Sequence, residues 1–385
     1  MYFLLAALTS FSVGFLVTPI VISLLKKAKI GDVPGGRKIH KAVTPSMGGI
    51  GFVLATFISL GIWGWQFPVP DMRYLLGAIA LMFLVGLRDD MVELKAKHKL
   101  LGQCVAVLLV IVAGDIRIKD FHGFLGLHEI PLLVSYGFSG FVLLALTNAF
   151  NLIDGLDGLA GTIASISLSL LGVWFYIQGF ESLAVLSFTL LGGVLAFLIF
   201  NWAPAKIFMG DTGSLTLGFA LGSLVVAFID LNAALPTGTF LKLQPAFTAG
   251  VVLMIYPLYD MARIFIKRIS QGRPPMSADK SHIHHFLMRM GMRHSQVALI
   301  LGSLQLILIS LVFILGEFSD NIVLPILSAI VLTLGFMMDR VTVKFVKKKV
   351  RRLPRILENR PLHSIPTGRI RLDKQSLESS SMNMN

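Results

Sequence analysis

The sequence predicts an all-α, polytopic integral membrane protein with about eleven transmembrane helices. Three observations support this fold class. The 385-residue chain contains 55% hydrophobic residues and has a mean hydropathy of +0.78, which is too apolar for a soluble domain of this length. Its apolar residues form long runs, most of them close to the ~20 residues that cross a bilayer. Its basic residues are unevenly divided between alternate connections.

Eleven apolar runs define the expected helices. The runs that begin at Tyr74, Leu100 and Leu215 are short for a complete span, so they need flanking residues or an end that lies inside the protein. The expected helices are Tyr2–Leu25, Met47–Trp65, Tyr74–Leu87, Leu100–Gly114, Ile130–Phe150, Leu159–Ile177, Leu183–Phe200, Leu215–Ile229, Ala246–Ile266, Val297–Leu315 and Ile322–Met338.

Lysine and arginine assign the connections to sides of the membrane. If the N-terminus is outside, 30 of the 34 basic residues lie in the inner connections and the C-terminal segment. Short loops with basic residues are retained in the cytoplasm, so we expect the N-terminus outside and the C-terminus in the cytoplasm. The same bias explains the net charge of +13, and no nucleic-acid partner is expected.

The chain divides into two expected regions. Residues 1–340 carry the helices and form one transmembrane domain, whereas residues 341–385 are basic and then rich in serine and asparagine. We expect the second region to be a flexible cytoplasmic tail. The only cysteine, Cys104, excludes an intramolecular disulfide.

The first inner connection, residues 31–49, combines glycine and proline turns with Arg37, Lys38, His40 and Lys41. A cradle for phosphate or nucleotide is one interpretation. An ordinary cytoplasmic loop with basic residues is the alternative, and this segment alone favours it.

The second inner connection opens with the acidic pair Asp89 and Asp90, followed by Glu93. Adjacent carboxylates beside a membrane helix repel one another and need a divalent cation or a cationic partner. The pair with a third acid is similar to magnesium sites that bind diphosphates. A solvated helix end balanced by nearby basic residues explains this segment alone equally well.

Two further inner connections carry acids at membrane depth. Asn151, Asp154 and Asp157 have no basic residue near them in the sequence, and a helix cap accounts for one aspartate but not for both. Asp211 and Ser214 precede a glycine-rich apolar helix, where backbone amides favour an anion and the carboxylate favours a cation. A metal-bridged phosphate and a simple helix N-cap both fit that second segment.

Three of the nine histidines, His282, His284 and His285, fall within four residues. No second His/Cys pair completes a four-ligand zinc site, so contacts to a diphosphate or to leaving charge fit these side chains better. If the inner connections meet on one face, the site they share contains carboxylates, a magnesium ion, glycine turns and cationic donors. These are the parts needed for a phosphoryl-type transfer.

The segments Asn151–Leu159, Phe208–Ser214 and His282–His285, with the Asp89-Asp90 pair upstream, resemble the polyprenyl-phosphate N-acetylhexosamine-1-phosphate transferases of bacterial envelope synthesis (glycosyltransferase family 4 type). The resemblance runs from about Asp32 to Arg293. The His-Ile-His-His pattern resembles the branch that uses UDP-N-acetylglucosamine more than the branch that transfers phospho-N-acetylmuramoyl-pentapeptide, where the histidines are contiguous.

The resemblance implies transfer of N-acetylglucosamine-1-phosphate from UDP-N-acetylglucosamine to undecaprenyl phosphate, yielding undecaprenyl-diphosphate-N-acetylglucosamine and UMP. It implies Mg²⁺, with Mn²⁺ as an alternative, and a multi-pass protein of the bacterial inner membrane with a cytoplasmic-face site. The reaction would be the first membrane step of a cell-envelope polysaccharide pathway, such as that of lipopolysaccharide or teichoic acid. Another UDP-N-acetylhexosamine or UDP-N-acetylmuramoyl-pentapeptide is the alternative donor, and a homodimer is a candidate assembly.

The resemblance also implies roles for individual residues. Glu93 replaces the usual third acid of the Asp-Asp-x-x-Asp pattern, so its role stays open. The expected metal ligands are Asp211, Asp89 and Asp90, and the expected catalytic residues are these three with His282, His284 and His285. The expected substrate-binding residues are Lys41, Ser46, Asn151, Asp154, Asp157, Asn201 and Phe208.

Two other classes of protein compete with this assignment. A secondary transporter of an anionic substrate would place its carboxylates near mid-membrane in broken helices, whereas here they fall at one face. A CDP-alcohol phosphotransferase would continue its motif with Ala-Arg, but Gly158 is followed by Leu159, Ala160 and Gly161.

Overall fold

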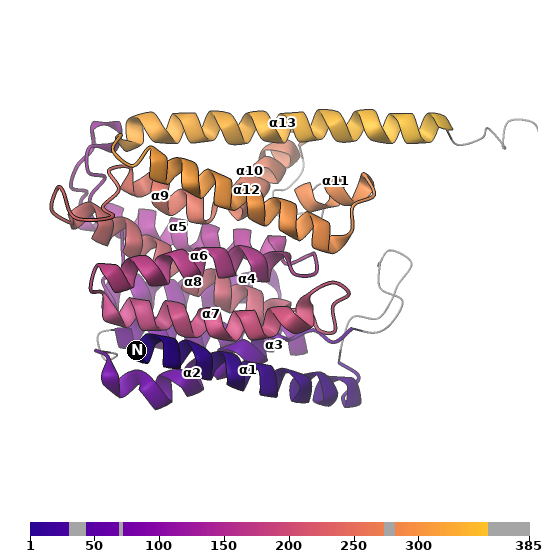
Figure 1. Ribbon diagram of the computed structural model, residues 1–385, viewed down its shortest axis with the longest axis horizontal. Coiled ribbons are helices and arrows are strands. Elements are labelled where there is room, and N and C mark those ends of the chain that lie inside the picture. Colours follow the sequence, from indigo (N-terminus) through magenta and orange to yellow (C-terminus); the bar gives the residue numbers. More distant parts are fainter. Residues whose placement is uncertain (31–43, 69–71, 273–281, 353–385) are drawn as a thin grey trace, which may run out of the picture. The chain divides into compact units, whose positions relative to one another are not determined.

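The computed structural model describes residues 1–30, 44–68, 72–272 and 282–352. The regular segments described there are helices, which confirms the all-α prediction (Figure 1). They are α1 (Tyr2–Lys27), α2 (Gly49–Trp63), η1 (Gly64–Gln66), α3 (Arg73–Met91), α4 (Ala96–Leu108), η3 (Leu109–Ala113), η4 (Phe124–Gly126), α5 (Leu132–Ile153), α6 (Leu159–Ile177), α7 (Glu181–Asn201), α8 (Gly210–Ala234), α9 (Ala246–Leu253), α10 (Ile255–Ser270), α11 (Ile283–Arg289), α12 (His294–Ile314) and α13 (Asp320–Arg352).

The chain separates into two compact units, Met1–Thr342 and Val343–Asn385. The first unit contains helices α1 to α12 and the greater part of α13. The prediction of a flexible tail concerns residues 341–385, and all of these beyond Arg352 lie outside the described residues.

Long apolar helices support the assignment to a polytopic membrane protein. Within the described ranges, nine helical segments are long and apolar enough to cross a bilayer. The pair α9 and α10, bent by 80°, is a tenth candidate. The eleventh predicted run lies on α3, which falls outside this set and has charged residues at both ends, Arg73 and the run Arg88–Asp90. The total of eleven spans and the outward N-terminus stay predictions.

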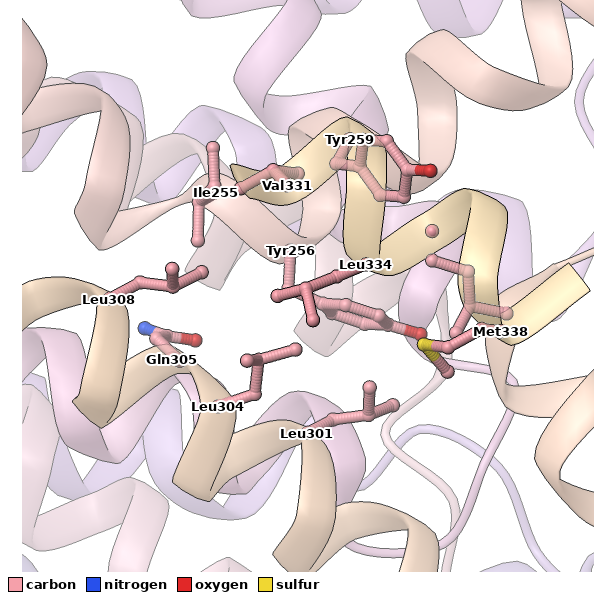
Figure 2. Close-up of a pocket in the computed structure, with 12 residues that line it drawn as sticks. Ile255, Tyr256, Tyr259, Leu301, Leu304, Gln305, Leu308, Val331, Leu334 and Met338 are labelled. Atoms are coloured by element: carbon pink, nitrogen blue, oxygen red, sulfur yellow. The ribbon is translucent and has the colours of Figure 1, made fainter. Parts of the chain in front are cut away.

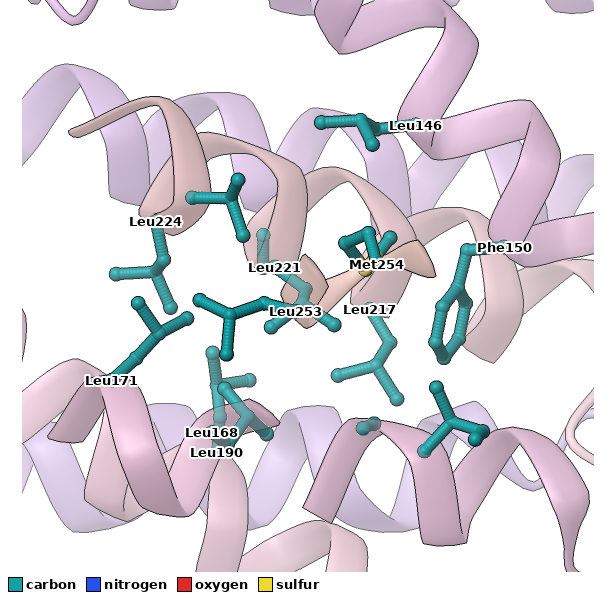
Figure 3. Packing of buried hydrophobic residues seen from close by; sticks show 14 of the residues in the cluster. Leu146, Phe150, Leu168, Leu171, Leu190, Leu217, Leu221, Leu224, Leu253 and Met254 are labelled. Atoms are coloured by element: carbon teal, nitrogen blue, oxygen red, sulfur yellow. The ribbon is translucent and has the colours of Figure 1, made fainter. Parts of the chain in front are cut away.

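Helix α8 lies at the centre of the first unit. It packs against α2, α3, α5, α6 and α9, and nearly all of its side chains are buried. Figure 3 shows Leu217, Leu221 and Leu224 of α8 in one cluster with Phe150 of α5 and Leu171 of α6. A helix that is apolar all round is stable in such a position, because each of its faces meets another helix. The first turn of α8 is therefore held firmly from several sides.

The bend between α9 and α10 has a covalent cause. In a continuous helix the amide of residue 257 would donate to the carbonyl of Leu253, but Pro257 has no N–H. The Leu253 carbonyl instead accepts hydrogen bonds from Ser167 Oγ of α6 (2.7 Å) and Gln305 Nε2 of α12 (3.0 Å). A backbone acceptor in an apolar surrounding needs such partners. These two side chains therefore hold the bend and set the direction of α10.

A small apolar pocket lies beside this bend, between α10, α12 and α13 (Figure 2). Its lining includes Tyr256 and Tyr259 of α10, Leu304 of α12 and Leu334 of α13. Gln305 contributes a polar group, and its buried Oε1 atom has no hydrogen-bond partner within the described part of the chain.

Candidate functional site

The predicted acids and amides meet where three helices end or begin. Asp89 and Asp90 lie in the last turn of α3, Asn151 lies in the last turn of α5, and Asp211 lies in the first turn of α8. The sequence placed these residues in the connections between helices. The structure corrects this by about one turn, because the helices extend past their apolar runs.

Asp90 caps the N-terminus of α8 from the neighbouring helix α3. Its carboxylate accepts hydrogen bonds from the backbone N–H of Asp211 (2.9 Å), the backbone N–H of Thr212 (2.8 Å) and Thr212 Oγ1 (2.6 Å). The first amides of a helix have no partner within the helix, and a carboxylate there also complements the helix dipole. Asp90 thus fixes the turn that carries Asp211. Its roles as a catalytic residue and as a metal ligand stay predictions.

Two glycines allow the backbones to approach this turn. A Cβ atom at Gly86 of α3 would lie 2.3 Å from the carbonyl oxygen of Asp211. A Cβ atom at Gly49 of α2 would lie 2.3 Å from backbone atoms of Gly213. Both distances are far shorter than van der Waals contact, so only glycine fits at either position. Gly49 thus serves close helix packing, at the end of the segment whose glycine turns suggested a phosphate cradle.

Lys99 joins the two ends of the acidic cluster. Its Nζ atom lies 2.9 Å from Asp89 Oδ2 and 2.8 Å from Asp211 Oδ2. Asp89 Oδ1 also accepts a hydrogen bond from the backbone N–H of Leu94 (2.6 Å). The sequence analysis missed Lys99 as a site residue. The available signal was its place immediately before the apolar run that starts at Leu100.

Asn151 completes the surroundings of Asp211. Its Nδ2 atom donates to Asp211 Oδ1 (2.6 Å) and to Ser214 Oγ (2.6 Å). Asp211 therefore lies between a cation, Lys99, on one oxygen and an amide on the other. The amide also has an oxygen, so a rotation of the Asn151 side chain would present a second hard ligand beside the carboxylate.

Asp154 follows α5 and carries the clearest sign of excess negative charge. Burial raises its pKa well above the usual range, and the nearby carboxylates of Asp211, Asp90 and Asp157 raise it further. Lys99 contacts two of the described acids, Asp89 and Asp211. A bound cation would relieve the remaining repulsion.

The oxygen-rich cluster fits a hard divalent cation such as Mg²⁺. Among the described residues, no group of three or more His, Cys, Asp or Glu side chains is arranged to hold a metal by itself. Mg²⁺ commonly uses one or two carboxylates and completes its shell with water and substrate phosphate oxygens. Asp211 and Asp89 are the carboxylates placed for this, with Asn151 and Ser214 beside them.

Two of the predicted substrate-binding residues join the connections together. Asn201 Oδ1 accepts from the backbone N–H of Gly158 (2.9 Å), and its Nδ2 donates to the carbonyl of Ile207 (2.9 Å). Asp157 is buried and accepts from the backbone N–H of Ala205 (3.1 Å). The connection between α5 and α6 is thereby tied to the one between α7 and α8. A role of either side chain in uridine binding stays a prediction.

Phe208 lies against the segment that precedes α2. Its backbone N–H donates to the carbonyl of Pro45 (2.8 Å), and its carbonyl accepts from the N–H of Gly48 (2.8 Å). This pairing brings Ser46, which is half-buried, to the same part of the molecule. Lys41 lies outside the described residues. Binding of substrate by Phe208 and Ser46 therefore stays a prediction.

The predicted histidines form a cluster at the start of α11. The rings of His282 and His284 lie 5.3 Å apart, and those of His284 and His285 lie 4.5 Å apart. His284 contacts the connection that carries Asp154, because a Cβ atom at Gly155 would lie 3.3 Å from His284 Nε2. The cluster thus borders the acidic site.

Burial lowers the pKa of His284 to about 3, and the neighbouring His285 lowers it as well. His284 is therefore a neutral imidazole at physiological pH. It can donate or accept a hydrogen bond, but it brings no positive charge to a diphosphate. The sequence suggested that His284 contacts a diphosphate or the leaving charge. As a neutral ring, it can make such a contact only through a hydrogen bond.

Asp260 of α10 is a second residue that the sequence analysis missed. It is fully buried and contacts His282 Nδ1 (2.7 Å) as well as the backbone N–H of Ile283 (2.9 Å). The available signal was an acid inside the apolar run Ala246–Ile266, because ionisable residues within membrane helices are costly and are retained for function.

Comparison with known proteins gives a consistent picture. A family model described as "Glycosyl transferase family 4" matches residues 72–229, which include Asp89, Asn151 and Asp211. A Bacillus subtilis (strain 168) protein named "Probable undecaprenyl-phosphate N-acetylglucosaminyl 1-phosphate transferase" is 32% identical over 307 residues, covering 77% of this chain and 80% of the relative.

Two enterobacterial relatives match over a greater length. The undecaprenyl-phosphate alpha-N-acetylglucosaminyl 1-phosphate transferase of Salmonella typhimurium is 31% identical over 373 residues, which cover 93% of this chain and 98% of the relative. The protein of the same name from Escherichia coli (strain K12) is 30% identical over 341 residues, covering 86% of this chain and 90% of the relative.

Proposed function

The chain belongs to glycosyl transferase family 4, and we propose that it transfers N-acetylglucosamine 1-phosphate from UDP-N-acetylglucosamine to undecaprenyl phosphate and releases UMP. The family resemblance predicted from the motifs is confirmed. The observation that carries the proposal is the meeting of Asp89, Lys99, Asn151 and Asp211 where apolar helices end.

The reaction joins a lipid to a nucleotide sugar, and the position of the cluster suits both. An oxygen of the acceptor phosphate attacks the phosphorus that carries the sugar. A new diphosphate bond forms, the bond between the two donor phosphates breaks, and its electron pair leaves with UMP. The acceptor phosphate is already ionised at neutral pH, so it needs little help from a base. The protein mainly has to position the two phosphates and offset their charge.

The chain's own residues divide this work. Lys99 holds Asp89 and Asp211 together, and Asp90 fixes the helix turn that carries Asp211. We propose that Asp211 and Asp89, with the Asn151 side chain, hold Mg²⁺. When bound, the ion would offset the charge of the donor diphosphate and of the departing UMP. The neutral His284 is suited to hydrogen bonding with the donor and not to proton donation at neutral pH.

The proposed reaction also implies a membrane location and a side for the acidic cluster. We propose that the protein is a multi-pass protein of the bacterial inner membrane, with the acidic cluster on the cytoplasmic side. The basic residues of the inner connections support this orientation. Nucleotide sugars are dissolved in the cytoplasm, whereas the acceptor is confined to the bilayer, so the two substrates would meet at that boundary.

A direct assay tests the proposal. The purified protein is incubated with undecaprenyl phosphate, magnesium and a panel of UDP-sugars, and UMP release is measured. We expect UDP-N-acetylglucosamine to be used fastest and no UMP without the lipid. Faster release from UDP-N-acetylmuramoyl-pentapeptide would overturn the choice of sugar, and no release from any donor would overturn the reaction.

A further inference from the structure

The buried carboxylate of Asp260 is paired with one ring nitrogen of His282. Its Oδ2 atom lies 2.7 Å from His282 Nδ1, and its Oδ1 atom accepts from the backbone N–H of Ile283 at 2.9 Å. Both oxygens of a carboxylate are acceptors, so we assign the proton of this contact to His282 Nδ1. The Nε2 atom is then the ring nitrogen through which His282 can meet a substrate.

The helix that carries Asp260 is held on both sides of this residue. Its start is fixed by the bend at Pro257, where Ser167 and Gln305 bind the carbonyl of Leu253. Three residues after Asp260, Arg263 forms an ion pair with Asp339 of α13 at 2.6 Å. A carboxylate on such a rigid support can orient the ring that it contacts.

We propose that Asp260 is a positioning residue for the transfer reaction. It holds His282 with the proton on Nδ1 and with a fixed ring orientation, so that Nε2 faces the nucleotide sugar. This inference rests on the proposed function, because it assumes that the histidine segment contacts the donor.

A purely structural role of Asp260 makes a different prediction. The bond from Ile283 N to Oδ1 alone would anchor α11, and an asparagine could replace it, because its amide oxygen accepts in the same way. The asparagine Nδ2 atom would donate to His282 Nδ1 and force the proton onto Nε2. The Asp260→Asn variant therefore keeps the anchor and reverses the tautomer.

The experiment combines nitrogen NMR with kinetics on the full-length protein. Variants with Asp260→Asn, His282→Asn and both changes are compared, and Asp339→Asn is the matched control that removes an equal charge from a contact with the same helix. In Asp260→Asn we expect the His282 signal to move from Nδ1–H to Nε2–H without a change in melting temperature. We expect kcat/KM to fall by about 10- to 100-fold, as for other partners that orient a histidine.

The double variant decides whether Asp260 acts through His282. We expect Asp260→Asn with His282→Asn to be no slower than His282→Asn alone, and Asp339→Asn to stay close to the unmodified protein. An unchanged tautomer in Asp260→Asn would overturn the proposal, as would multiplied losses in the double variant or full activity of His282→Asn. If no variant and no unmodified protein releases UMP, the proposed function fails, whereas the NMR result still reports the pairing itself.

Discussion

Charge balance governs the site at the scale of single residues. Asp89 and Asp211 share one lysine, Lys99. Both carboxylate oxygens of Asp90 accept hydrogen bonds from the first turn of α8. Asp154 is left with a raised pKa among these acids. The acids therefore carry more negative charge than Lys99 offsets, and a bound cation would balance the remainder.

Asp211→Asn tests the proposed metal ligand. The amide keeps the size of the side chain but removes the charge that would hold Mg²⁺, so we expect turnover to fall by at least about 100-fold. UMP release is measured at limiting and at saturating magnesium. Near-normal activity at limiting magnesium would show that Asp211 does not hold the ion.

Asp154→Asn tests the excess of negative charge. The pKa of Asp154 is raised in the folded protein. Ionisation of this carboxyl therefore lowers the stability of the folded state as the pH rises above 3.8, the ordinary pKa of an aspartate. Without divalent ions, we expect the asparagine variant to melt higher than the unmodified protein at pH 8, and equally at pH 4 or below. Magnesium should shrink the difference at pH 8. A difference that is the same at every pH would refute the explanation.

At the scale of elements, two helix ends decide the geometry of the site. The N-terminus of α8 is fixed by Asp90 and by close backbone contact at Gly86 and Gly49. The start of α10 is fixed by the bend at Pro257 and its two partners. Both devices act on backbone groups that a helix end or a proline leaves without a partner.

Gly86→Ala tests the first device. The added Cβ atom would lie 2.3 Å from the Asp211 carbonyl oxygen, so α3 and α8 must move apart. A shift of about 1 Å at a reacting group can cost about 100-fold in rate, and we expect a loss of kcat of that order. Gly61→Ala is the control, because a Cβ atom there meets nothing within 4 Å. Equal activity of the two variants would contradict the tight contact.

Ser167→Ala and Gln305→Leu test the second device. Either change leaves the Leu253 carbonyl one partner, whereas the double variant buries it with none, at a cost of about 1–3 kcal/mol. We therefore expect the double variant to lose more stability than the sum of the single variants in thermal unfolding. Ser187→Ala is the control, because among the described residues that hydroxyl bonds within its own helix, to the Leu183 carbonyl. Because Gln305 Nε2 also donates to Ser167 Oγ (2.8 Å), each single variant already loses that bond. A loss in the double variant below the sum of the single variants would therefore mean that the two side chains do not substitute for each other.

At the scale of the whole molecule, the helices were largely predictable and the contacts between them were not. Each apolar run marked helical structure, because a backbone in lipid must satisfy its own hydrogen bonds. The run Ala246–Ile266, predicted as one helix, is two, α9 and α10, bent by 80°. Lys99 was missed because its partner Asp211 is 112 positions away in the sequence. Asp260 was counted within an apolar run, since only its packing against α11 gives it a partner. The motif aspartates were found by their pattern, but Asp90 as a helix cap required the fold.

Cysteine labelling tests the sidedness of the molecule. In a Cys104→Ala background, Lys97→Cys and Thr237→Cys place single thiols at exposed positions in the connections expected inside and outside. We expect a membrane-impermeant maleimide to label Thr237→Cys in intact cells and Lys97→Cys only after the membrane is opened. Labelling of both in intact cells would refute the orientation.

The bend at Pro257 also imposes an order on biosynthesis. The chain enters the membrane from its N-terminus, and the Leu253 carbonyl needs one partner 86 residues earlier and another 52 residues later. The earlier partner is already inserted when α9 arrives, but the later one comes only with α12. Until then Ser167 alone holds the Leu253 carbonyl, so the start of α10, which carries Asp260, gains its second support only after residue 305 has been made. A chain that ends before α12 would therefore contain the acidic cluster but lack one of the two side chains that hold the bend beside Asp260.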